Sequence, residues 1–110
     1  MFTSVFATAS VRDLRAAEAF YTQLFGAEPD SRPMAGLLEW HLPHGAAVQV
    51  FQDPDRAGAG SLVLTTDDLD ADVERMRRAG LECGDPQSGG GARIVRLSDP
   101  EGTRIVLFGA

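Results

Sequence analysis

The amino-acid sequence repeats itself once along its length. The stretch "FATASVRDLRAAEAFYTQLFGAEPD" aligns with "SLVLTTDDLDADVERMRRAGLECGD", and "PHGAAVQVF" aligns with "PEGTRIVLF". The chain therefore consists of two copies of a unit of about 55 residues. We expect one domain, in which the first copy covers about 1–55 and the second about 58–110.

Both copies predict the same order of elements. Asp13 and Asp68 suit the start of a helix, because their carboxylates accept backbone N–H bonds, and Gly26 and Gly80 suit helix ends. Short runs of apolar and β-branched residues predict strands. The expected strands are 4–10, near 28–32, 36–42, 46–51, 61–66, near 81–84, 92–98 and 103–108. Each unit is thus βαβββ, and the Gly-rich loop 85–92, with Gly89, Gly90 and Gly91, is expected to be mobile.

Composition limits the function classes. The net charge of −6 argues against a nucleic-acid partner, since phosphate neutralisation needs a basic face, and it is compatible with a cationic ligand. No apolar run is long enough to span a membrane. The beginning of the chain lacks the basic region of a signal peptide, and the single cysteine, Cys83, cannot form an internal disulfide. These features predict a cytoplasmic protein without a membrane partner.

Strand alternation predicts two different faces. One face is consistently aliphatic and is expected to lie under the helices; Trp40 is placed there, although the opposite assignment would make it an aromatic wall of a binding site. The other face mixes aromatic, aliphatic and polar side chains, as small-molecule sites do. Its candidate ligand-binding residues are Phe6, Thr8, Glu39, His41, Gln49, Phe51, Ser61, Val63, Arg96, Val106 and Phe108. A dimer contact or a second packed core are the alternatives.

Two motifs carry a resemblance to a known family. The stretch "ASVRDLRAAEAFYTQLFGAEPD" and the ending "RLSDPEGTRIVLF" resemble the vicinal oxygen chelate superfamily, which includes glyoxalase I, bleomycin-resistance proteins and extradiol dioxygenases. The resemblance implies an α+β fold. Its two tandem βαβββ modules would form a curved, open, barrel-like mixed sheet with helices on the convex face. It also implies a homodimer whose pockets combine modules, often from both subunits.

The same resemblance identifies where the metalloenzymes of the family hold a divalent metal. Carried onto this chain, the ligand positions are Phe6, Gln49, Ser61 and Val106. A valine and a phenylalanine offer no lone pair, whereas such sites need histidine nitrogens and carboxylate oxygens. We therefore expect no metal and no cofactor, and neither metal-dependent glyoxalase nor dioxygenase chemistry.

Glu39 and His41 are the candidates for acid/base chemistry, since side chains two apart on a strand are neighbours. Glu39 also aligns with Arg96 in the repeat, so we favour a structural Glu39–Arg96 ion pair or a ligand-orienting role over catalysis. His44 is expected to be an exposed turn residue, and Cys83 lacks an obvious histidine partner.

The leading hypothesis for function is a metal-free protein that binds an aromatic or amphipathic small molecule, with antibiotic or secondary-metabolite sequestration in a dimeric pocket. The alternatives are a metal-independent enzyme that uses Glu39 and His41, and a non-catalytic accessory module.

Overall fold

The computed structural model describes residues 1–89 and 91–110, and its elements follow one order twice. The first set is β1 (Val5–Val11), α1 (Leu14–Phe25), β2 (Ser31–Met34), β3 (Leu37–His41) and β4 (Ala46–Gln52). The second set is β5 (Ser61–Thr66), α2 (Leu69–Arg78), β6 (Gln87–Gly89), β7 (Ala92–Ser98) and β8 (Arg104–Gly109). Short 3-10 turns occupy Pro43–Gly45 and Pro54–Arg56. The predicted βαβββ repeat is confirmed.

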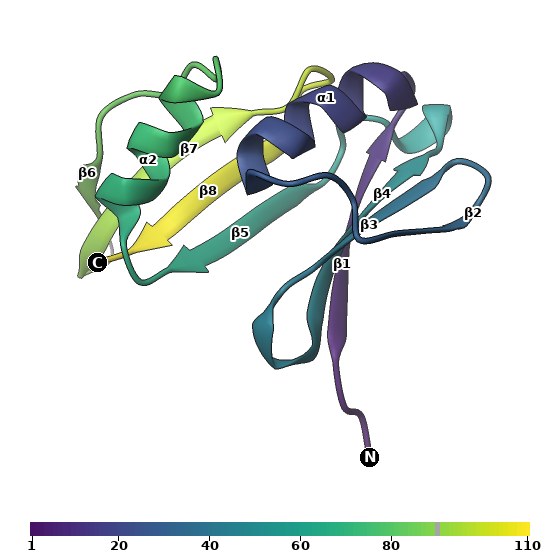
Figure 1. Ribbon diagram of the computed structural model, residues 1–110, viewed down its shortest axis with the longest axis horizontal. Helices are drawn as coiled ribbons and strands as arrows, with labels where there is room; N and C mark the ends of the chain where they lie inside the picture. Colours follow the sequence, from purple (N-terminus) through teal and green to yellow (C-terminus); the bar gives the residue numbers. More distant parts are fainter. Residues whose placement is uncertain (90) are drawn as a thin grey trace.

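The strands form two four-stranded sheets with the same topology. The strand order is β1-β4-β3-β2 in the first sheet and β5-β8-β7-β6 in the second. The first strand of each set pairs in parallel with the last, and the remaining pairs are antiparallel. Figure 1 shows β1 and β5 diverging from the place where they meet, while the N-terminal residues project away from the body. The fold is α+β, and the described strands do not close into a barrel.

Both helices begin where the sequence predicts. The Asp13 carboxylate accepts a hydrogen bond from the backbone N–H of Ala16 at 3.1 Å, and the Asp68 carboxylate accepts one from Ala71 at the same distance. Gly26 ends α1 in the left-handed conformation, with φ 73°. The last turn of α2 ends at Ala79, and Gly80 follows at φ 92°. Neither described helix is long and apolar enough to cross a bilayer.

The edge strands differ from the prediction. The strand expected near 81–84 is wrong, because this stretch bonds to α2 instead of to a sheet: Leu81 N–H donates to the carbonyl of Met76, and Arg77 donates to the carbonyl of Cys83. The edge strand is β6, inside the stretch expected to be a loop. The expectation of mobility at Gly90 lies outside the described residues. In the first repeat, β2 starts later than expected, after Pro29, which has no N–H to donate.

The aliphatic face forms the core, as predicted. One continuous cluster contains buried residues of both repeats, including Val48, Val50, Leu62 and Ile105. Trp40 is part of this core. Its ring stacks on Phe25 with centroids 5.5 Å apart, and its Nε1 donates to the carbonyl of Ala27 at 2.9 Å. Trp40 is therefore not a wall of the opposite face.

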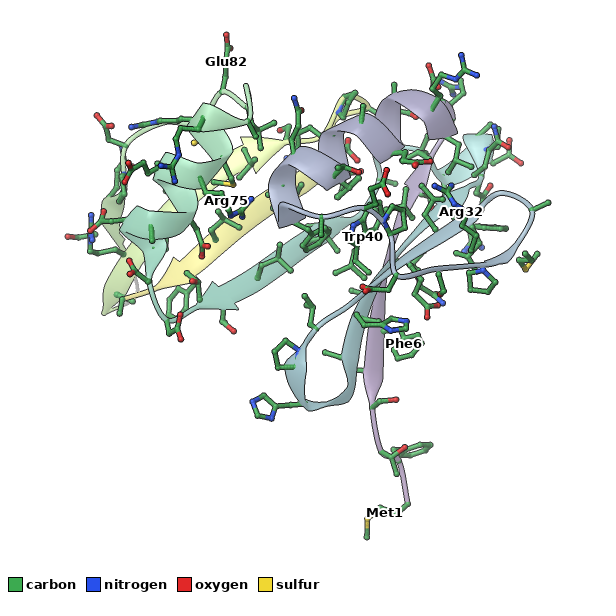
Figure 2. The ribbon with its side chains drawn as sticks, viewed as in Figure 1. Met1, Phe6, Arg32, Trp40, Arg75 and Glu82 are labelled. Atoms are coloured by element: carbon green, nitrogen blue, oxygen red, sulfur yellow. The ribbon has the colours of Figure 1, made fainter. Side chains whose placement is uncertain are left out.

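The second repeat holds both ends of α1. The carboxylate of Glu101 accepts the backbone N–H groups of Arg12 and Asp13, at the positive end of the helix dipole. At the negative end, the Arg75 guanidinium donates to the carbonyl of Leu24 at 2.7 Å. Figure 2 shows Arg75 in the space between α2 and α1. These contacts position the two sheets relative to each other.

Candidate functional site

The predicted site residues lie on the sheet surfaces that face away from the helices. The residues of the first sheet are Phe6, Thr8, Glu39, His41, Gln49 and Phe51, and those of the second are Ser61, Val63, Arg96, Val106 and Phe108. In the first sheet one row runs Thr8–Gln49–Glu39 across β1, β4 and β3, and the next row ends at His41. The pleat therefore brings the polar members of the first sheet together.

These polar side chains form one hydrogen-bonded cluster. Gln49 Nε2 donates to Glu39 Oε2 at 2.8 Å, and His41 Nε2 lies 2.7 Å from Glu39 Oε1. Thr8 Oγ1 donates to Gln49 Oε1 at the longer distance of 3.5 Å. Both carboxylate oxygens of Glu39 are engaged, and its side chain is only 11% exposed. We call Thr8, Glu39, His41 and Gln49 the polar cluster.

The cluster holds Glu39 in its ionised form. The hydrogen bond from Gln49 lowers the pKa of the Glu39 carboxyl, and the hydrogen bond from His41 lowers it further. An ionised carboxylate accepts but does not donate, so His41 Nε2 carries the proton that the two groups share. Nδ1 of a neutral His41 is then left as an acceptor on a side chain that is 53% exposed. The cluster can thus orient a ligand, or accept a proton from one.

Apolar side chains accompany the polar cluster on the first sheet and Arg96 on the second. Phe6 is 48% exposed and Val63 is 65% exposed, while Phe51, Val106 and Phe108 are half-buried. Aromatic side chains beside a few fixed polar groups are typical of the lining of small-molecule sites. Figure 2 shows Phe6 on β1, on the side of the chain where the N-terminus projects.

The expected Glu39–Arg96 ion pair is not formed. Arg96 lies on β7, opposite Val106, and has no carboxylate within 4.0 Å among the described residues. Glu39 lies in the other sheet and bonds to His41 and Gln49 instead. Equivalent positions of the two repeats occupy separate sheets, so alignment in the repeat does not mean proximity. His44 is an exposed turn residue, as expected, at φ 66°.

The residue types do not fit the metal site implied by the resemblance. Phe6 and Gln49 lie on the first sheet, and Ser61 and Val106 lie on the second. Phenylalanine and valine have no donor atom, so half of the ligand set has no atom to coordinate an ion. Within residues 1–89 and 91–110, no three His, Cys, Asp or Glu side chains gather as a metal centre.

A second concave site lies elsewhere, and sequence reasoning missed it. It has a volume of about 740 Å³ and lies between the end of α1, α2, β5 and the turn before β4. Phe25, Leu42, His44 and Met76 line it, and Val63 is the member of the predicted set that it includes. Arg75 also lines this cavity, but its guanidinium donates to the carbonyl of Leu24 at the end of α1. This cavity results from packing between elements far apart in sequence, which no local pattern reports.

The chain matches a family model over nearly its whole length. The Glyoxalase/Bleomycin resistance protein/Dioxygenase superfamily model matches residues 4–107. No curated protein sequence matches the chain.

Solved structures share the fold. A glyoxalase/bleomycin resistance protein from Catenulispora acidiphila is 31% identical, with a TM-score of 0.91 and 99% of each chain covered. TnmS3, an antibiotic binding protein from a Streptomyces species, is 24% identical, with a TM-score of 0.81 and coverage of 99% of this chain and 96% of that chain. A bleomycin-binding protein complexed with bleomycin is also 24% identical, with a TM-score of 0.75 and coverage of 100% and 98%.

Proposed function

This chain belongs to the Glyoxalase/Bleomycin resistance protein/Dioxygenase superfamily, and we propose that it is a small-molecule-binding protein that works without a metal ion. The observation that carries the proposal is the polar cluster, which shares one face of the first sheet with Phe6 and Phe51. A fixed carboxylate and amide supply orientation, and the apolar surface supplies affinity.

Two relatives by fold support this class of function. One is named as an antibiotic binding protein and one was solved with bleomycin bound. We extend the proposal to sequestration of an antibiotic or another secondary metabolite, in which binding alone is the function. Because Phe6 and Val63 are exposed in the isolated chain, we also propose a homodimer in which a second copy encloses the ligand.

Native mass spectrometry of the purified protein is the first test. We expect a dimer of about twice 11.7 kDa that carries a co-purified small molecule. A thermal-shift panel of bleomycin and aromatic antibiotics follows. A ligand present at about 100 times its Kd stabilises the folded state by about 2.7 kcal/mol and raises Tm by several degrees.

Glu39→Gln is the matched variant for this test. It removes the charge to which His41 and Gln49 are bonded, so we expect the ligand-dependent rise in Tm to shrink. Glu82→Gln is the control, because Glu82 is exposed and Figure 2 shows it on the opposite side of the molecule from Phe6. Equal shifts in both variants contradict the assignment of the polar cluster. A panel without any shift, on protein that carries no small molecule, contradicts the proposed function.

The Glu39–His41 contact favours a second candidate, a metal-independent enzyme. The 2.7 Å hydrogen bond holds the His41 ring in one orientation, as a general base requires. Once a ligand is known, mass analysis of that ligand after incubation with the protein tests for turnover. Catalysis predicts a changed ligand with the wild type and with His44→Ala, and an unchanged but bound ligand with His41→Ala.

A further inference from the structure

Two arginines are neighbours on the face of the second sheet that carries Val106. Arg96 on β7 lies opposite Val106, and Arg104 on β8 lies opposite Ser98. They are therefore diagonal neighbours across an antiparallel pair, roughly 7–8 Å apart at the backbone, within reach of each other for long side chains. Both are exposed.

This pair lacks the counter-charges that most arginines of the chain have. Arginines with a carboxylate within 4.0 Å are Arg32, Arg56, Arg75, Arg77, Arg78 and Arg93. Neither Arg96 nor Arg104 has such a partner among the described residues, although acidic residues outnumber basic ones by 16 to 10. Adjacent positive charges without a partner repel each other, and an anion placed between them relieves the repulsion.

The surroundings of the pair suit an anion attached to an apolar body. Ser61 and Ser98 flank Arg104 in one row across the sheet, and their hydroxyls are additional donors. The next row contains Val63 and Val106, which are apolar. Guanidinium groups bind carboxylates, sulfonates and phosphates through paired N–H bonds.

We propose that Arg96 and Arg104 form an anion subsite, and that the ligand of this protein carries an acidic group beside its apolar part. The inference rests on the proposed small-molecule function and deepens it by naming the ligand class. The chain has a net negative charge. Arg96 and Arg104 nevertheless make this part of the second sheet selective for a negatively charged group.

A matched pair of fluorescent probes tests the subsite. Anilinonaphthalene sulfonate has an aromatic body with a sulfonate, and phenylnaphthylamine is the same body without the charge. We expect the sulfonate probe to bind more tightly to the wild type. Arg96→Gln and Arg104→Gln should each weaken it about fivefold, which corresponds to about 1 kcal/mol for an exposed charge pair. The uncharged probe should bind all variants equally.

Arg15→Gln is the control variant. Arg15 is an exposed arginine of α1 on the helix side, so its substitution changes the net charge by the same amount and should leave both affinities unchanged. Added salt should weaken sulfonate binding in the wild type more than in the double variant.

The outcomes separate this inference from the proposed function. If phenylnaphthylamine binds but the arginine substitutions leave the sulfonate affinity unchanged, the anion subsite is wrong and the small-molecule function stands. If neither probe binds, both are wrong. If the substitutions turn a dimer into a monomer in native mass spectrometry without affecting the preference for the sulfonate, the arginines pair with a second copy of the chain and the subsite is wrong.

Discussion

At the scale of single residues, hydrogen-bond acceptors distinguish two core aromatic side chains that the sequence pattern does not. Tyr21 and Trp40 are both aromatic residues of the core, and each donates a hydrogen bond to one specific acceptor. Tyr21 O–H donates to Asp99 Oδ2 at 2.8 Å, and Asp99 Oδ1 accepts the backbone N–H groups of Glu101 and Thr103. Tyr21 thus connects α1 to the turn between β7 and β8.

The Tyr21–Asp99 bond predicts a loss of stability in alkali. Burial raises the pKa of the Tyr21 hydroxyl, and the Asp99 carboxylate raises it further. The unfolded chain releases this proton above about pH 10 while the folded chain keeps it, so the free energy of unfolding should fall there by about 1.4 kcal/mol per pH unit. The sequence contains no lysine and a single tyrosine, so few other groups titrate in this range. Urea unfolding between pH 8 and 11 measures this fall in the free energy of unfolding.

Tyr21→Phe is the corresponding variant. At pH 8 it should cost about 1–3 kcal/mol, because it leaves one oxygen of the buried Asp99 without its donor. Above pH 10 its stability should no longer fall as that of the wild type does. An equal alkaline loss in both proteins contradicts the assignment to Tyr21.

At the scale of elements, the two helices obey the same local rule. Each begins with an aspartate whose carboxylate accepts a backbone N–H bond, and each is followed by a glycine with positive φ. The edge strands do not follow from one local pattern. A short edge strand forms only where its backbone N–H and C=O groups pair with a neighbouring strand and not with a helix. The stretch 81–84 shows this, since α2 takes them.

The cap at Asp68 gives the element-scale prediction. Asp68→Ala should lower the free energy of unfolding by about 1 kcal/mol, because it removes the acceptor of the Ala71 N–H. Asp68→Asn should cost less, since the amide oxygen still accepts. Asp67→Ala, at the exposed neighbour, serves as the control and should leave the urea midpoint unchanged. If Asp67→Ala and Asp68→Ala cost the same, the cap contributes nothing specific.

At the scale of the whole molecule, contacts between the repeats hold the two sheets in one arrangement. Glu101 and Arg75 hold the two ends of α1 from the second repeat. The linker between the repeats adds a third contact, where Gly58 N–H donates to the carbonyl of Ser10 at 3.2 Å. There the linker passes directly over the turn that carries Glu101.

Gly58 tests this contact. It lies at φ 77°, and a Cβ built on it would be 2.2 Å from the carbonyl oxygen of Glu101. Gly58→Ala should therefore destabilise the protein by about 2–4 kcal/mol, through backbone strain and a clash with backbone that cannot move aside easily. Gly60→Ala is the control, because the nearest atom to its Cβ would be 3.9 Å away. Similar urea midpoints for the two variants contradict a tight inter-repeat contact.

The sequence by itself determined the repeat, the βαβββ order, both helix starts and the two faces of the sheets. These follow from helix caps such as Asp13 and from the alternation of side chains along a strand, which are local properties of the chain. The same alternation placed Glu39, His41 and Gln49 on one face before any contact was known.

Only the tertiary structure decided which of those residues touch. It joined Glu39 to His41 and Gln49 within one sheet and left Arg96 in the other sheet beside Arg104. It also settled Trp40 in the core, where the sequence had placed it, and formed a cavity between α1, α2 and β5. The physical reason is that strand register and helix packing bring together residues far apart in sequence. Pairwise distances across separate sheets therefore depend on the whole chain and not on any local pattern.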